Sequence, residues 1–253
     1  MKVLTVIQTK GGSGKTTTAQ VIASAAVERG LRVHMLDGDV NAQLVRWRGR
    51  FEQAEWDIAE KPEWPQNLTV SKPPVVVEEL YALLEELEGQ GIDLVIVDTR
   101  PGTHTDTEDL CLAADLVIIP ARPLYSEWEL TEESFLWMGR LADTIDKADR
   151  FPEVRTLVMD APPKVVDAAS REGGVAELPR RDQEVLQRLI ALPHLDTIVP
   201  TSKILGQIAF HGPLGAAKRA NEVSRGGRLI ADAIGRQLDV ALSLLDEIVE
   251  LTS

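Results

Sequence analysis

Short runs of Val, Ile and Leu recur along the chain, each bounded by polar or turn-forming residues. The runs have the length and composition of buried parallel strands, and they cover residues 3–7, 32–36, 94–97, 116–119, 154–159 and 197–199. Between them, apolar residues recur at helical spacing over residues 16–29, 75–88, 127–145, 181–191 and from about 228 onward. This alternation predicts an α/β fold, a doubly wound, mainly parallel sheet with helices on both faces.

Two stretches depart from this alternation. Residues 46–74 contain Trp47, Trp56, Trp64 and several prolines, and we interpret them as an irregular excursion. The excursion is either a partner or dimer surface, or a decoration folded back on the same domain, and the second interpretation is favoured because tryptophans are usually packed. Residues 160–181 form a polar connection with Pro and Gly that we expect to be mobile. We expect one domain across residues 1–253.

The most specific motif is a glycine-rich loop directly after the first apolar run. It consists of Lys10, Gly11, Gly12, Ser13, Gly14, Lys15, Thr16 and Thr17. Glycines let backbone N–H groups converge on phosphate oxygens, and the helix that follows directs its positive N-terminal end toward them. Lys15 is placed to neutralise the β and γ phosphates, and Thr16 to offer its hydroxyl to Mg²⁺. The loop therefore predicts a nucleoside triphosphate site.

A lysine, Lys10, opens this loop, which gives it the form K-G-G-x-G-K-T. This form resembles the deviant Walker A loop of the ParA/MinD ATPases. The resemblance implies a P-loop NTPase of that type, which binds ATP and Mg²⁺ and forms a nucleotide-sandwich homodimer when ATP is bound. It also implies that Lys10 reaches across the dimer to the partner's phosphates, so that Lys10 and Lys15 both take part in catalysis.

Carboxylates follow two of the predicted strands. Asp37 and Asp39 end the second run as a D-x-D element, and Asp98 ends the run at residues 94–97 in the form of a Walker B strand. The resemblance implies that Asp39 orients the water that attacks the γ-phosphate. It implies that Asp37 helps to place water or Mg²⁺, and that Asp98 holds the Mg²⁺ shell through Thr16 or water. Val40 and Asn41 replace the Pro-Gln that often follows in the family, which weakens inference about the contacts after Asp39.

Other positions are assigned by resemblance alone. Asp160 lies where relatives often place a base-contacting asparagine, and Pro200 and Ser202 lie in a segment similar to the one that wraps adenine. Arg100 occupies a place that the family commonly gives to a small residue or proline. Two interpretations of Arg100 remain open: a sensor of phosphate or the dimer partner, or a solvent-facing loop arginine.

Composition and charge limit the binding partners and the cellular location that we expect for this protein. The net charge is −13, with 27 basic and 40 acidic residues, which disfavours indiscriminate binding to nucleic acid or anionic lipid. A single cysteine, Cys111, excludes a disulfide framework and a metal cluster held within one chain by several thiolates. No leader or membrane-length apolar run is evident, so we expect a cytoplasmic protein that does not act at a membrane.

Basic residues gather near the end of the chain. Residues 203–236 contain six basic and two acidic residues, and the candidate contacts to DNA among them are Lys218, Arg219, Arg225 and Arg228. ParA-like dimers hold DNA through basic residues in this region without reading its sequence. Ordinary solvated side chains are an equally open interpretation of this patch.

The combined evidence predicts a Mg²⁺-dependent ATPase that positions DNA, as in plasmid or chromosome partition, or a related cargo, and releases it on hydrolysis. A ParB-like or cargo-bound activator is the expected partner. The alternative is a MinD-like or other P-loop ATPase that acts on a membrane, a protein or a metal cluster. A membrane role is disfavoured because the terminal helix ends in Asp246, Glu247 and Glu250, whereas membrane-binding helices present basic residues.

Overall fold

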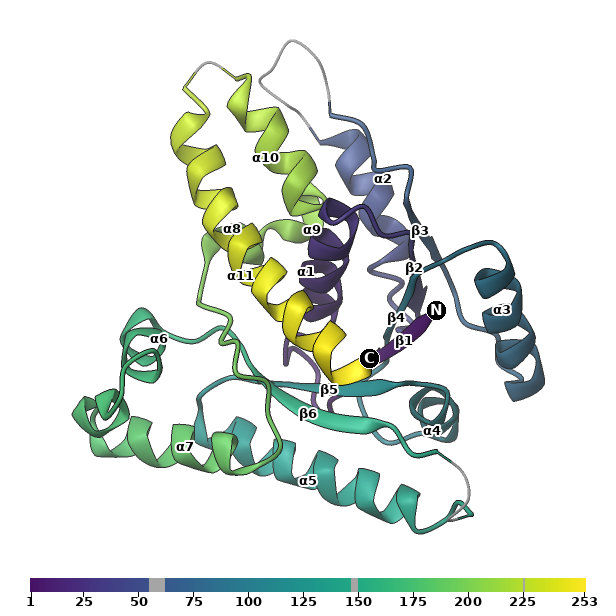
Figure 1. The fold of residues 1–253 in the computed structure, drawn as a ribbon, viewed down its shortest axis with the longest axis horizontal. Coiled ribbons are helices and arrows are strands. Elements are labelled where there is room, and N and C mark those ends of the chain that lie inside the picture. Colours follow the sequence, from purple (N-terminus) through teal and green to yellow (C-terminus); the bar gives the residue numbers. More distant parts are fainter. Residues whose placement is uncertain (55–61, 147–149, 225) are drawn as a thin grey trace.

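The computed structural model describes residues 1–54, 62–146, 150–224 and 226–253. Its sheet has the order β3-β2-β4-β1-β5-β6, and every neighbouring pair of strands is parallel. In chain order, the strands are β1 (Lys2–Val6), β2 (Val33–Asp37), β3 (Leu68–Ser71), β4 (Leu94–Asp98), β5 (Leu116–Ala121) and β6 (Glu153–Val158). The predicted doubly wound parallel sheet is confirmed (Figure 1).

Helices cover both faces of the sheet. They are α1 (Lys15–Glu28), α2 (Val45–Gln53), α3 (Val77–Gly89), α4 (Thr105–Leu112), α5 (Tyr125–Ala142), α6 (Pro163–Ala169), α7 (Arg180–Ala191), α8 (Lys203–Gly206), α9 (Ile208–His211), α10 (Leu214–Glu222) and α11 (Arg228–Thr252). α1, α2, α10 and α11 contribute to one apolar cluster, and α3, α4 and α5 to another. Figure 1 shows α1, α10 and α11 together, with α5 and α7 along the opposite side of the sheet.

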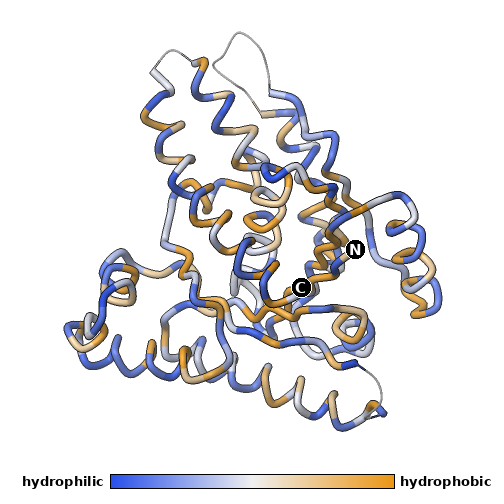
Figure 2. Tube along the Cα trace, viewed as in Figure 1, coloured by the Kyte–Doolittle hydropathy of each residue, from blue (hydrophilic) through white to orange (hydrophobic). Residues whose placement is uncertain are grey.

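The strands supply side chains to both clusters because successive residues point to opposite faces. In β1, Leu4 and Val6 join the cluster under α1, whereas Val3 packs in the cluster under α3 to α5. Figure 2 shows hydrophobic segments gathered along the strands, with hydrophilic and hydrophobic segments alternating along the outer helices. Burial on both faces explains why these strands read as continuous apolar runs.

One strand prediction was wrong, and one strand was missed. Residues 197–199 do not form a strand of the sheet; isolated bridges flank them, Thr156 with His194 and Ala161 with Pro200. Part of the hydrogen bonding of this segment goes elsewhere, since the Thr197 N–H donates to Glu247 Oε2 on α11 at 3.0 Å. The missed strand is β3, a four-residue edge strand inside the segment predicted to be irregular.

The predicted excursion at 46–74 is therefore more regular than expected, since it contains most of α2 and all of β3. Trp47 and Trp64 are buried in the core, with ring centroids 5.2 Å apart in an edge-to-face arrangement. This packing favours the folded-back interpretation for these two residues, while Trp56 lies outside the described residues. The connection at 160–181 is also more regular than predicted, because it contains α6 and a short 3₁₀ helix, Gly174–Glu177.

Among the residues that the structure describes, no helix is both long and apolar enough to cross a membrane.

Trp47 gives a test of this packing. Its side chain is fully buried, and its indole Nε1 donates to the Ile208 carbonyl at 2.8 Å. We expect Trp47→Ala to lower the free energy of unfolding by about 3–5 kcal/mol, because it leaves a cavity and removes a buried hydrogen bond. Urea denaturation measures the change, and Val45→Ala on the exposed side of α2 is the control, expected within about 0.5 kcal/mol of wild type. Equal losses in both variants would contradict this packing.

Candidate functional site

The glycine-rich loop joins the end of β1 to the start of α1, at the carboxyl edge of the sheet. Gly14 begins the helix in a left-handed conformation, with φ of 97°, which side chains rarely adopt. A Cβ added to Gly14 would lie 2.4 Å from Met159 Sδ, so even alanine would force a rearrangement. The glycine is thus required both by backbone conformation and by close packing against the residue after β6.

Lys15, the first residue of α1, is almost completely buried. Its ammonium donates to the loop carbonyls of Lys10 at 3.3 Å and Gln8 at 3.5 Å. Burial lowers the pKa of Lys15, and the carboxylates of Asp98 and Asp39 oppose this shift. The Lys15 ammonium is therefore held at the loop by neutral carbonyl oxygens, which attract a cation less strongly than a phosphate does. An anionic ligand could replace these contacts.

Asp98 ends β4 next to the loop. Its Oδ2 accepts a hydrogen bond from Thr16 Oγ1 at 2.6 Å, while its buried Oδ1 has no hydrogen-bond partner. Burial raises the pKa of Asp98 to about 7; the Thr16 hydrogen bond opposes the shift and Asp37 adds to it. A buried carboxylate with an unpaired oxygen is costly by itself. It becomes favourable where a cation, or water bound to a cation, approaches.

The two carboxylates after β2 have different surroundings. Asp37 is buried, and its Oδ2 accepts the N–H groups of Leu44 at 2.8 Å and Val45 at 2.9 Å at the start of α2. This geometry favours a helix-capping role for Asp37 over the predicted contact with water or Mg²⁺. Asp39 is half-buried, and its Oδ1 accepts from the backbone and side-chain nitrogens of Asn41 at 2.7 and 2.9 Å. The residue that departs from the family pattern, Asn41, thus orients Asp39.

Two neighbouring cavities lie along the loop. A cavity of about 340 Å³ is lined by residues of the loop and its surroundings, Gly11, Gly12, Gly14, Lys15, Thr16, Thr17, Asp39, Asn41, Pro101 and Arg122. A cavity of about 140 Å³ brings together the predicted base contacts Asp160, Pro200 and Ser202. Gly14, Thr17 and Arg122 line both cavities. The shared lining shows that the two cavities adjoin each other.

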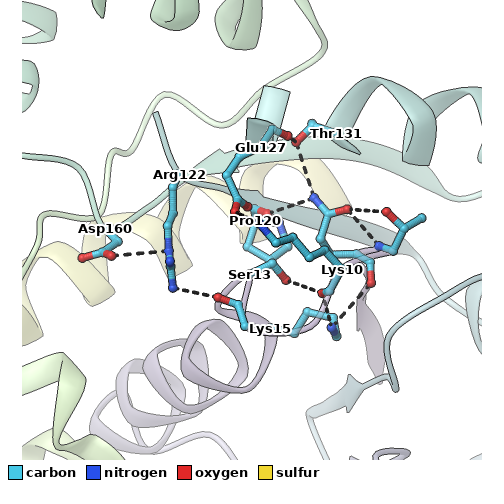
Figure 3. A network of polar contacts seen from close by, with 11 residues as sticks. Lys10, Ser13, Lys15, Pro120, Arg122, Glu127, Thr131 and Asp160 are labelled. Atoms are coloured by element: carbon cyan, nitrogen blue, oxygen red, sulfur yellow. Dashed lines mark hydrogen bonds and ion pairs between the residues drawn. The ribbon is translucent and has the colours of Figure 1, made fainter. Parts of the chain in front are cut away.

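Residues from β5 and α5 complete the surroundings of the loop, and the sequence analysis did not assign them. Arg122 Nη2 donates to the Gly12 carbonyl at 2.7 Å, and its Nε lies 3.4 Å from Asp160 Oδ2 (Figure 3). Glu127, in the first turn of α5, pairs with Lys10. Ile119, Pro120 and Pro123 form an I-P-x-x-P pattern that begins within β5, and this pattern was the available signal, but it does not indicate which side chains turn toward the loop.

Arg100 does not face the loop cavity. Its Nη2 donates to Asp106 Oδ1 on α4 at 2.6 Å, and the side chain lines a separate cavity of about 180 Å³ beside α3 and α4. One interpretation of Arg100 required contact with phosphate or with a dimer partner, and the other required a loop side chain that faces solvent. The ion pair with Asp106 accounts for the orientation of the Arg100 side chain in another way, because it attaches the loop after β4 to α4.

The basic patch is partly neutralised within the chain. Arg219 Nη1 lies 2.8 Å from Glu28 Oε2, and Lys218 Nζ lies 3.6 Å from Glu222 Oε1. Arg228, at the start of α11, is exposed, and Arg225 lies outside the described residues. Of the described residues predicted to contact DNA, Arg228 is thus the one that is exposed and forms no ion pair with another described residue.

A family model for the VirC1 protein matches residues 1–131, about half of the chain. The chain belongs to the VirC1 family. The VirC1 protein of Rhizobium radiobacter is 31% identical over 121 residues, which cover 47% of this chain and 48% of that protein. The ParA protein of the same organism is 29% identical over 161 residues, 64% of this chain and 67% of that protein. The chain therefore matches about half the length of its VirC1 relative.

The fold agrees with this membership. The septum site-determining protein MinD of Pyrococcus horikoshii, solved with Mg-ADP, superimposes with a TM-score of 0.59 at 16% identity, covering 100% of this chain and 98% of that one. The resemblance to ParA/MinD ATPases that rested on the glycine loop is confirmed for the family and for the fold. The matched region contains the glycine loop, Asp39 and Asp98, so the VirC1 family shares the part of the chain that builds the site.

The environment of Asp98 predicts a pH-dependent stability. Because its pKa is about 7 in the folded chain and near 3.8 when unfolded, the folded state binds more protons and loses stability as pH rises through 7. Asp98→Asn cannot titrate. Without nucleotide or metal, we expect its stability relative to wild type to increase by about 1 kcal/mol between pH 6 and pH 8.

Urea unfolding at the two pH values measures this difference. Asp232→Asn, at an exposed position of α11, is the matched isosteric control. A stability difference between Asp98→Asn and wild type that is the same at both pH values would show that Asp98 does not titrate in this range.

Proposed function

We propose that this protein is a Mg²⁺-dependent ATPase whose nucleotide site is formed by the glycine-rich loop and the carboxyl edges of β2 and β4. One observation carries the proposal: the Thr16 hydroxyl and the Asp98 carboxylate meet at 2.6 Å directly below the loop, and Asp98 retains a buried, unpaired oxygen. This pairing is the arrangement that phosphoryl-transfer enzymes with a glycine loop use around their divalent ion. Membership of a family related to ParA supports the same proposal.

The residues present fit Mg²⁺ as an ion held mainly by phosphate and water. Among the described residues, no group of three or more His, Cys, Asp or Glu side chains is arranged to hold a metal by itself. Thr16 would contribute its hydroxyl and Asp98 would accept from coordinated water, because Mg²⁺ keeps several waters in such sites. When bound, the ion neutralises charge on the phosphate oxygens.

The protein groups then have separate tasks. Backbone N–H groups of the loop and the α1 N-terminus orient the phosphates, and Lys15 leaves the carbonyls of Gln8 and Lys10 to neutralise them. Asp39, oriented by Asn41 at the rim of the same cavity, positions the attacking water. Asp160, Pro200 and Ser202 would enclose the base in the adjoining cavity. Catalysis rests on alignment and charge neutralisation, which these groups supply.

We further propose that ATP binding promotes a sandwich homodimer, to which Lys10 contributes across the interface, and that the dimer positions DNA or a related cargo until hydrolysis releases it. A ParB-like or cargo-bound activator would stimulate turnover. The names of its relatives, ParA and VirC1, support this proposal through family membership. Arg228 and Arg236 are exposed on α11 and supply positive charge for phosphate contacts.

The single cysteine of the chain, Cys111, gives little support to the alternative in which a metal cluster is the cargo. Cys111 is fully buried between α4 and the sheet, and burial raises the pKa of its thiol. A thiolate that bridges two protomers must be accessible and readily ionised. Cys111 therefore acts as a packing residue.

Turnover tests the nucleotide proposal. Lys15→Ala is expected to abolish measurable phosphate release, and Asp39→Ala to lower kcat by about 100-fold while changing ATP affinity by less than about threefold. Released phosphate measures kcat, and titration with a fluorescent ATP analogue measures affinity. Asp106→Ala, which removes the Arg100 partner outside the loop cavity, is the control. Unchanged turnover in Asp39→Ala would exclude it as the water-positioning residue.

DNA binding is tested by the anisotropy of a random-sequence duplex with Mg²⁺ and either ATP or ADP. We expect binding only with ATP, and we expect Arg228→Glu with Arg236→Glu to weaken it and reduce the slope of log affinity against log salt by about 2. Arg180→Glu with Arg181→Glu on α7 changes the net charge equally and is the control. Equal losses in the two double variants would place the DNA contacts elsewhere.

A further inference from the structure

Lys10 opens the phosphate loop, yet it is not among the described residues that line the loop cavity. Its ammonium lies 3.0 Å from Glu127 Oε1, in the first turn of α5 (Figure 3). The Lys10 side chain is 47% exposed, whereas that of Glu127 is 3% exposed. The pair thus joins a cation that reaches solvent to a carboxylate that is fixed inside the protein.

α5 is attached to the loop by more than this pair. Gln8, between β1 and the loop, donates through Nε2 to the Pro120 carbonyl and to Thr131 Oγ1, and its Oε1 accepts from Ser134 Oγ at 2.9 Å. The backbone carbonyl of the same residue accepts from Lys15. The buried side of α5 therefore contacts the residue that supports the phosphate-binding lysine.

Glu127 is incompletely satisfied even with Lys10 in place. Its Oε2 is buried and has no hydrogen-bond partner, while the N-terminal end of α5 provides a favourable potential for the negative charge. Without Lys10, Glu127 would have no ion pair within the part of the chain that the structure describes, and a buried charge without its partner is strongly unfavourable. Glu127 therefore opposes departure of Lys10 from this position.

We infer that Glu127 is a positioning residue that holds the Lys10 ammonium away from the phosphates in the nucleotide-free chain and releases it when nucleotide binds. The inference rests on the proposed function, in which Lys10 contacts phosphate. Because the ion pair spans the loop and α5, its release exposes the first turn of α5 to rearrangement. Leu124 and Tyr125 lie at this turn and are both exposed. A rearrangement of the turn on nucleotide binding would therefore change the surface of the protein there.

A double-mutant cycle tests the coupling. Glu127→Gln keeps the shape of the side chain but removes its charge, so Lys10 becomes available and no buried charge is left unpaired. We expect the Kd for ATPγS with Mg²⁺ to fall by about tenfold, because an affinity is reduced by the fraction of molecules held in a non-binding state. In a Lys10→Gln background, the same substitution is expected to leave the Kd unchanged.

Glu129→Gln, an exposed charge on the same helix, is the matched control and should bind ATPγS as wild type does. If Glu127→Gln binds like this control, or if its effect persists in the Lys10→Gln background, Glu127 does not act through Lys10. Failure of wild type to bind ATPγS would overturn the proposed function and this inference together. Normal binding by wild type with no effect of Glu127→Gln would overturn this inference alone.

Hydrogen exchange provides a measurement that does not depend on Glu127→Gln folding. In wild type, we expect ATPγS to increase amide exchange over residues 124–131. Lys10→Gln without nucleotide should show the same increase, because the pair is already broken from its exposed side. Slow exchange over this segment in nucleotide-free Lys10→Gln would overturn the inference.

Discussion

The parallel register of β2, β4 and β1 positions the whole site. Asp37 is in register with Asp98, and Asp98 with Val6, so that two carboxylates and the strand that leads into the glycine loop end at one level. The N–H of Gly38 donates to the Asp98 carbonyl at 2.8 Å, which fixes the spacing just beyond the strands. A shift of one residue in either pairing would turn a carboxylate to the opposite face of the sheet.

That register places the carboxylates of Asp37, Asp39 and Asp98 close together, and the surrounding groups stabilise these like charges to different degrees. Asp37 is stabilised by the amides that begin α2, and Asp39 by Asn41. Asp98 is stabilised by the hydrogen bond from Thr16 and by the nearby charge of Lys15, yet burial raises its pKa to about 7. A site whose charge is left incompletely compensated is prepared for a cationic ligand, and its stability without that ligand is correspondingly lower.

Cationic side chains surround the loop, in contrast to the carboxylates at the strand ends. Lys10, Lys15 and Arg122 each contact protein oxygens: the Glu127 carboxylate, loop carbonyls and the Gly12 carbonyl. Each of these contacts is one that a phosphate can replace. Arg122 directly follows β5 and Glu127 lies on α5, both more than 100 residues from the loop in sequence, so the loop contacts a distant part of the chain.

The fold class, the strands β1, β2, β4, β5 and β6 and the glycine-rich loop could be predicted from the sequence, because buried parallel strands and phosphate loops depend on local composition and spacing. Asp39 and Asp98 were assigned through the resemblance that this loop carries. The sequence did not determine β3, the capping role of Asp37, or the contacts of Arg122 and Glu127. An edge strand of four residues has little periodic signal, and the direction of a side chain beyond a strand end depends on which helix packs there. Those contacts depend on long-range packing, which brings Lys10 and Glu127 within 3.0 Å across 117 residues of sequence.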